Sequence, residues 1–89
     1  MPVFMIERRY AEQLDLSADE LRELTEINDD EQVRWLYSFL SVDRRKTYCL
    51  YDAADPEAIR RAAVRAGLPA DSVVEIGARV LPDGSAVPV

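Results

Sequence analysis

Histidine is absent from this 89-residue chain. Its absence removes the commonest general acid/base near neutral pH and the commonest ligand of transition metals. Nucleophilic pairs of the Ser–His and Cys–His types cannot form within the chain. Any acid/base chemistry is therefore left to carboxylates, tyrosines and a single thiol.

Cysteine is almost absent as well, since Cys49 is the only one. One cysteine cannot form an internal disulfide, which is typical of proteins in a reducing compartment. No apolar run approaches the roughly 18–20 residues of a membrane span. The first ten residues have no basic segment ahead of an apolar one, so we see no signal peptide. These features predict a cytoplasmic protein.

Positive charge is in deficit, with 17 acidic residues against 11 basic ones and a formal net charge of −6. Binding to nucleic acid needs a concentrated positive face, so we expect no nucleic-acid partner. The same deficit argues against binding to an anionic membrane surface. An apolar content of 48% with 31% charged residues is typical of an ordinary globular domain.

The chain is short enough to predict one domain, over residues 1–81, followed by a C-terminal tail at 82–89 broken by proline and glycine. Apolar periodicity predicts strands over residues 3–10, 32–42, 46–53 and 71–81, and helices over 17–31 and 55–69. Their order is that of the ferredoxin-like βαββαβ fold, in the α+β class. Two helices are then expected on one face of a four-stranded antiparallel sheet.

Both helices carry terminal signatures. Ser17 and Glu20 are spaced as a capping box, which satisfies two amide donors at the start of the first helix. Asp55 is placed as the N-cap of the second helix, with Pro56 at its first position. Gly67 is placed for a left-handed C-cap.

The strands at 32–42 and 46–53 are separated by a short polar loop, which predicts a hairpin. Pairing about Arg44 sets Phe39 opposite Cys49. It places the aliphatic Leu36, Leu40 and Leu50 together with Phe4 and Ile6, on the face that packs against the helices. The opposite face then carries Met5, Glu7, Trp35, Tyr37, Phe39, Cys49 and Tyr51. So large an apolar patch needs a partner, and two sheets packed face to face as a homodimeric α/β barrel would cover it.

This predicted aromatic face is either the core of the dimer or the wall of a ligand pocket within it. The candidate ligand-binding residues are Glu7, Trp35, Tyr37, Cys49, Tyr51 and Glu75. A carboxylate on an apolar face needs a partner, and for Glu7 this is either a structural ion pair or a bound cation. Cys49 is either a small apolar residue or a thiolate that, with Glu7, would suit nickel or zinc.

The first predicted helix is strongly acidic. Asp19, Glu23 and Glu26 recur on one of its faces. Charged outer faces are routine on amphipathic helices, so solvent exposure is the simpler interpretation. Weak binding of a divalent metal is the alternative, if the ligands converge.

Several segments resemble a family of small actinobacterial proteins described as nickel-binding or as a domain of unknown function. The segments are Glu7-Arg8 in the first strand, "VRWL" followed by Ser38, "KTYCLYDA" and "DPEAIRRAAVRAGLP". The resemblance reaches to about residue 81, and it implies a ferredoxin-like fold, a dimeric α+β barrel and nickel as a cofactor. Relatives commonly carry a histidine where this chain has Tyr37.

The leading hypothesis is a homodimeric protein that binds a metal ion or a small ligand between its sheets. An enzyme of the dimeric α/β-barrel type is the alternative, a monooxygenase or isomerase with Glu7 as base and Tyr51 as proton donor. A structural or interaction module without a ligand is the third possibility.

Overall fold

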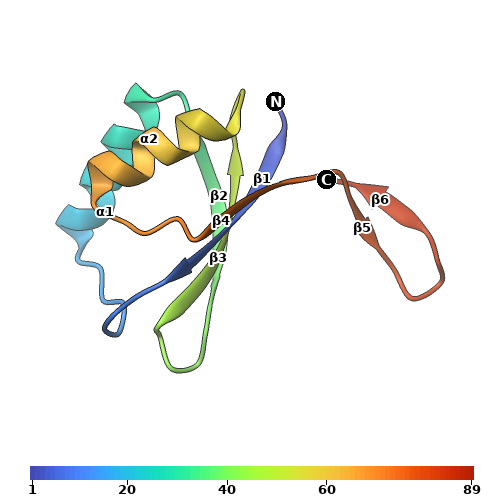
Figure 1. Cartoon of the computed structure of the whole chain (residues 1–89), viewed down its shortest axis with the longest axis horizontal. Coiled ribbons are helices and arrows are strands. Elements are labelled where there is room, and N and C mark those ends of the chain that lie inside the picture. The colour runs from blue at the N-terminus through green and yellow to red at the C-terminus, as the bar shows by residue number, and fades with distance from the viewer.

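A computed structural model describes residues 1–89. Its elements are β1 (Val3–Arg9), α1 (Ala18–Asp30), β2 (Arg34–Leu40), β3 (Lys46–Asp52), α2 (Pro56–Ala66), β4 (Ser72–Ile76), β5 (Ala78–Val80) and β6 (Ala86–Pro88). The first four strands form one antiparallel sheet in the order β2-β3-β1-β4. Both helices lie on one side of this sheet (Figure 1). The predicted ferredoxin-like α+β architecture is confirmed. Neither helix has the length and apolar character that crossing a bilayer would require.

The predicted start of α1 is confirmed in detail. The Ser17 hydroxyl accepts from the Glu20 amide at 3.1 Å, and the Glu20 carboxylate accepts from the Ser17 amide at 3.4 Å. This reciprocal pair satisfies two of the four amides that a helix start leaves without partners. The connector before α1 can therefore end sharply at residue 17.

The predicted ends of α2 are confirmed as well. Asp55 Oδ1 accepts from the Ala58 amide at 2.9 Å, and Pro56 occupies the first turn. Gly67 ends the helix with φ of +68°, in the left-handed region that a side chain disfavours. These caps hold α2 at a defined length, so that its small residues meet the sheet.

The hydrophobic core lies between α2 and the helix-facing side of the sheet. Its buried members are Phe4, Ile6, Val33, Cys49, Tyr51, Ala53, Ala58, Ile59 and Ala62, with Ile27, Ala70 and Val73 packed against them. The alanines of α2 allow close approach of the helix to the strands. As predicted, Phe4 and Ile6 face the helices, whereas Met5 and Glu7 point to the other side.

The predicted register of the β2–β3 hairpin is wrong by one residue. Phe39 pairs with Tyr48, and Leu40 with Thr47, whereas pairing about Arg44 had set Phe39 opposite Cys49. The turn occupies residues 42–45, one residue more than expected. Two backbone hydrogen bonds close it: the Ser41 amide donates to the Lys46 carbonyl, and the Arg44 amide donates to the Ser41 carbonyl. Arg44 adopts φ of +61° there. A one-residue shift moves every β3 side chain to the other face.

A β-bulge interrupts β2 between Trp35 and Tyr37. Trp35 pairs with Tyr51, but Tyr37 pairs with Leu50, so Leu36 is the extra residue. Strict alternation would place Trp35 and Tyr37 on one face of the sheet. The bulge instead sends them to opposite faces, because an unpaired residue resets the alternation.

The predicted last strand, at 71–81, is divided at Gly77 into β4 and β5. β5 pairs with β6 in a separate hairpin, so the segment expected as a tail is partly ordered by strand pairing. In Figure 1 this hairpin projects away from the helices and from the main sheet. None of its residues belongs to the hydrophobic core.

Candidate functional site

The helix-facing side of the sheet contains a cavity of about 110 Å³, beneath α1 and the connector that precedes it. Its apolar walls are Leu14, Leu16, Leu24, Trp35, Leu40 and Leu68, and its polar groups are Arg8, Tyr10, Ser38, Thr47, Cys49 and Tyr51. A largely apolar hollow with a few convergent polar groups is the usual form of a small-molecule site. We call it the helix-side cavity.

Arg8 is the charged group of the helix-side cavity, and its side chain is unusually buried for a cation, at 2% exposure. One guanidinium nitrogen donates to the Pro69 carbonyl, and another donates to the Tyr51 hydroxyl at 3.5 Å. The guanidinium carbon also lies 5.7 Å from the centre of the Tyr51 ring. No carboxylate comes within 4 Å of Arg8. The positive charge therefore has no counter-ion in the chain.

Hydroxyl groups line the same cavity. Tyr10 and Thr47 share a hydrogen bond of 2.9 Å between their oxygens, and the Cys49 thiol donates to Thr47 Oγ1 at 3.4 Å. Burial raises the pKa of both Tyr10 and Tyr51 above the ordinary value of 10.0. Both phenols consequently stay protonated at neutral pH and remain hydrogen-bond donors.

The opposite side of the sheet carries no helix, and we call it the uncovered face. One row of side chains across it is Tyr37, Leu50, Met5 and Val74, and the next is Phe39, Tyr48, Glu7 and Ser72. Tyr37 and Phe39 are 55% and 58% exposed, and their rings meet edge to face with centroids 5.6 Å apart. Large aromatic side chains exposed side by side are typical of an interaction surface.

Glu7 lies on the uncovered face and is held by two cations. Its carboxylate is 2.8 Å from Lys46 Nζ and 3.6 Å from an Arg9 nitrogen. The hydrogen bond from Lys46 lowers the Glu7 pKa below 4.5, and the same bond raises the Lys46 pKa above 10.5. Glu7 is therefore a paired carboxylate, which makes it a weak general base.

The structure divides the predicted site residues between the two sides of the sheet. Glu7 and Tyr37 lie on the uncovered face, as expected. The placement of Cys49, Tyr51 and Trp35 on that face is wrong, because the hairpin register and the β2 bulge turn them toward the helices. Glu75, paired with Phe4, alternates away from the Glu7 side at the exposed edge of the sheet.

The group that sequence reasoning missed is Arg8. It occupies the same alternating series as Phe4 and Ile6, both of which were expected to face the helices. A cation in an otherwise apolar, helix-facing series was the available indication of a buried polar site. The aromatic residues of β2 and β3 had instead led us to predict a site on the opposite face of the sheet.

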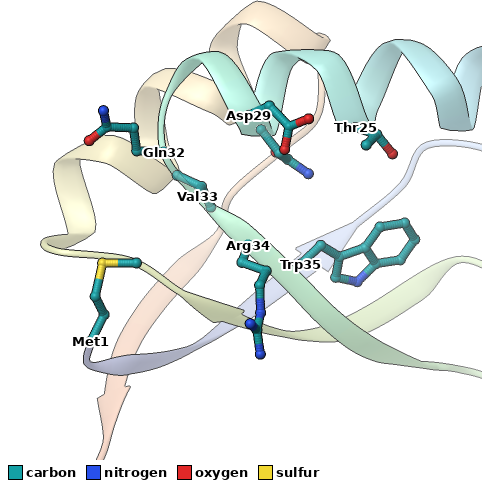
Figure 2. A pocket seen from close by; sticks show the side chains of 8 residues that line it. Met1, Thr25, Asp29, Gln32, Val33, Arg34 and Trp35 are labelled. Atoms are coloured by element: carbon teal, nitrogen blue, oxygen red, sulfur yellow. The ribbon is translucent and has the colours of Figure 1, made fainter.

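A second, more open hollow lies at the edge of the sheet, between the C-terminal part of α1 and the N-terminus of the chain. Figure 2 shows Asp29 and Thr25 above it on α1, with Arg34 and Trp35 on the strand below. Trp35 also lines the helix-side cavity, and its indole nitrogen donates to Ser38 at 2.8 Å. The indole thus forms part of the wall between the two hollows.

The residues present do not fit a metal centre within one chain. Glu7 and Cys49, the predicted metal ligands, belong to opposite faces, since Cys49 pairs with Ile6 and its neighbour Tyr48 pairs with Glu7. The Cys49 thiol is buried and donates a hydrogen bond to Thr47, and Glu7 forms a salt bridge with Lys46. Nowhere do three acidic or cysteine side chains converge. Transition-metal sites in proteins usually need three or four such donors.

Comparison with known proteins gives a consistent assignment. A family model described as "Nickel responsive protein SCO4226-like" matches residues 4–76. A search of curated proteins finds no match. The crystal structure of SCO4226 from Streptomyces coelicolor A3(2) resembles this one with a TM-score of 0.63 and 26% identity. That match covers 83% of this chain and 94% of the other.

The matched region runs from Phe4 in β1 to Ile76 at the end of β4, so it contains both helices and all of the four-stranded sheet except Val3. It includes Arg8, Glu7 and every residue of the helix-side cavity, and it excludes the projecting β5–β6 hairpin. The family resemblance seen in the sequence is thereby confirmed. The chain belongs to the SCO4226-like family of nickel responsive proteins.

Proposed function

We propose that this protein is a homodimer whose two uncovered faces pack together and hold a small ligand beside Glu7. The observation that carries the proposal is the exposure of Tyr37 and Phe39 on a sheet face that no helix covers. Val74 on β4 is exposed as well and extends the apolar surface to the far edge of the sheet. A surface of this kind in water favours association.

Face-to-face packing would bury Tyr37 and Val74, the exposed ends of the apolar row that runs through Leu50 and Met5. The Glu7–Lys46 pair lies in the adjacent row, so a ligand held between the sheets would meet apolar walls and one compact ion pair. Pockets of this composition bind small molecules by burying their apolar parts and orienting their polar ones. The proposed assembly is a dimeric α/β barrel.

Sedimentation analysis tests the assembly. The proposal predicts a species of twice the 10.1 kDa chain mass. Replacement of Phe39 by Asp should shift the protein to monomer, because a buried charge at the interface has no partner. Val64→Asp is the matched control, since Val64 is exposed on α2 in the helix layer. Wild-type protein that stays monomeric at all concentrations would refute the dimer.

Native mass spectrometry tests the ligand. A retained molecule would appear as a mass excess in native spectra that disappears on denaturation. Glu7→Gln, which removes the carboxylate charge while keeping the side-chain shape, should reduce that excess. A dimer of unmodified mass in both spectra would favour a structural or interaction module instead.

Nickel is the second candidate ligand, favoured by the description of the family. The donor groups of one chain do not fit such a site, so we assign no nickel coordination. Calorimetric titration of the purified protein with Ni²⁺ decides the matter, with Glu7→Gln and Cys49→Ser as the variants that test the two predicted ligands. Heat equal to the buffer blank would exclude nickel as the ligand of this protein.

The enzyme alternative has less support than the binding function. Glu7 was the proposed base and Tyr51 the proposed proton donor, but their side chains point to opposite sides of the sheet. The lowered Glu7 pKa and the raised Tyr51 pKa also disfavour proton transfer by either group near neutral pH. The cytoplasm stays our proposed location, on the evidence of the single unpaired cysteine.

A further inference from the structure

The helix-side cavity contains hydrogen-bond donors that no acceptor in the chain uses. Two of the Arg8 nitrogens each donate to one protein oxygen, and no other acceptor satisfies the rest of its five N–H groups. The Tyr51 hydroxyl accepts from Arg8, and its own proton has no acceptor in the chain. Unused donors gathered around a buried positive charge are complementary to an anion.

The charge balance of the cavity leads to the same conclusion. A buried guanidinium without a counter-ion is costly, since desolvation removes its interaction with water. The remaining polar groups of the cavity are the uncharged side chains of Tyr10, Ser38, Thr47 and Cys49, in addition to Tyr51. The nearest ion pairs in sequence, made by Glu7 and Arg9, are on strand positions that alternate to the other face.

The size and walls of the cavity define the rest of the ligand. Five leucines and Trp35 enclose about 110 Å³. An apolar cavity of about 150 Å³ holds the six carbon atoms of one benzene molecule, so this smaller one suits a ligand of about four carbon atoms. A forked guanidinium binds a carboxylate through two parallel hydrogen bonds.

We propose that the helix-side cavity binds a small aliphatic monocarboxylate, with its carboxylate on Arg8 and Tyr51 and its hydrocarbon chain among the leucines. This site lies within one subunit and is separated by the sheet from the ligand site proposed between the two subunits. Each proposal can therefore be tested and rejected without affecting the other.

The test uses the wild-type protein and three ligands of matched shape: sodium butyrate, butyramide and n-butylamine. Trp35 is the only tryptophan and lines the cavity, so its fluorescence reports occupancy. Ligand-observed NMR provides a second, independent readout. Butyrate should give a saturable change in both, whereas the neutral amide and the cationic amine should give none.

Two variants locate the carboxylate. Arg8→Met should weaken butyrate binding by roughly tenfold or more, since hydrogen bonds to charged groups are the strong ones. Arg60→Met is the matched control, because Arg60 is exposed on α2 and forms no ion pair. Tyr51→Phe keeps the ring in the core and removes only the hydroxyl. We expect Tyr51→Phe to bind butyrate about tenfold more weakly than wild type, and this variant tests the carboxylate position if Arg8→Met does not fold.

Equal binding of butyrate and butyramide would overturn the proposal, as would the absence of any saturable change. Undiminished butyrate binding by both Tyr51→Phe and a folded Arg8→Met would overturn it too. Sedimentation of the same samples keeps the two proposals apart. A protein that is dimeric but does not bind butyrate contradicts only the proposed cavity site. A protein that is monomeric but binds butyrate contradicts only the proposed dimer.

Discussion

Lys46 Nζ lies 2.8 Å from Glu7 Oε1, linking β3 to β1 on the uncovered face. The two side chains are 28% and 30% exposed, so the pair is sheltered but not dry. Lys46 also lies over the Tyr48 ring, with its nitrogen 5.0 Å from the centroid. The ion pair is thus placed beside the aromatic groups that we propose to pack against a second subunit.

This pair predicts an acid-dependent stability. The pKa of Glu7 is lowered by Lys46, so its contribution is present above the ordinary value of 4.5 and is lost as pH falls through the lowered value. Urea unfolding should therefore find wild type more stable than Glu7→Gln at neutral pH, with the difference vanishing in acid. Glu12→Gln, an exposed position without an ion pair, is the control and should show no such pH dependence. A Glu7→Gln difference that is unchanged by acid would contradict the pairing.

Cys49 is predicted to be unreactive in the native protein. Its side chain is 5% exposed, faces the helices and donates to Thr47. A thiol reagent such as dithionitrobenzoate should label it only after unfolding, because the buried sulfur is out of reach of the reagent. Rapid labelling of the native protein would mean that β3 presents Cys49 on the uncovered face, as the sequence alone had suggested.

The N-cap of α2 is predicted to be a measurable source of stability. Asp55→Ala removes the acceptor of the Ala58 amide and should lower the free energy of unfolding by about 1 kcal/mol. Asp15→Ala is the control, since Asp15 is exposed in the connector before α1 and should change stability little. Thermal and urea unfolding measure both variants. Equal effects of the two substitutions would show that the hydrogen bond contributes nothing specific.

The projecting hairpin is predicted to be dispensable for folding of the main body. β5 and β6 lie beyond the family match and contribute no residue to the core. A chain shortened to residues 1–77 should keep the near-ultraviolet circular dichroism of Trp35 and a cooperative unfolding transition. Loss of the transition would mean that the domain extends past β4, as the boundary predicted at residue 81 implies.

The caps, the order of elements and the fold class could be predicted from the sequence, because each depends on neighbouring residues. Ser17 and Glu20 cap the start of α1 through hydrogen bonds to each other. Asp55 and Gly67, at the two ends of α2, each form hydrogen bonds to residues about one helical turn away. The strand order and the common side of the two helices then follow from the limited ways of connecting such elements. Membership of the family was evident for the same reason, in contiguous segments.

The location of the candidate site could not be predicted, because it depends on register between strands. One added turn residue near Arg44 moved Cys49 and Tyr51 to the helix side, and one bulge separated Trp35 from Tyr37. Side chains alternate along a strand with a period of two, so a register shift of one residue moves every side chain of that strand to the other face of the sheet.

By itself the sequence determined a small ferredoxin-like domain with one sheet face left for a partner. Only the tertiary structure decided that Arg8 is buried without a counter-ion and donates to the Tyr51 hydroxyl in the wall of a cavity. Burial and pairing of a charge are properties of elements distant in the chain, here β1, β3 and the loop at Pro69. Local sequence patterns do not contain those contacts, because packing between elements creates them.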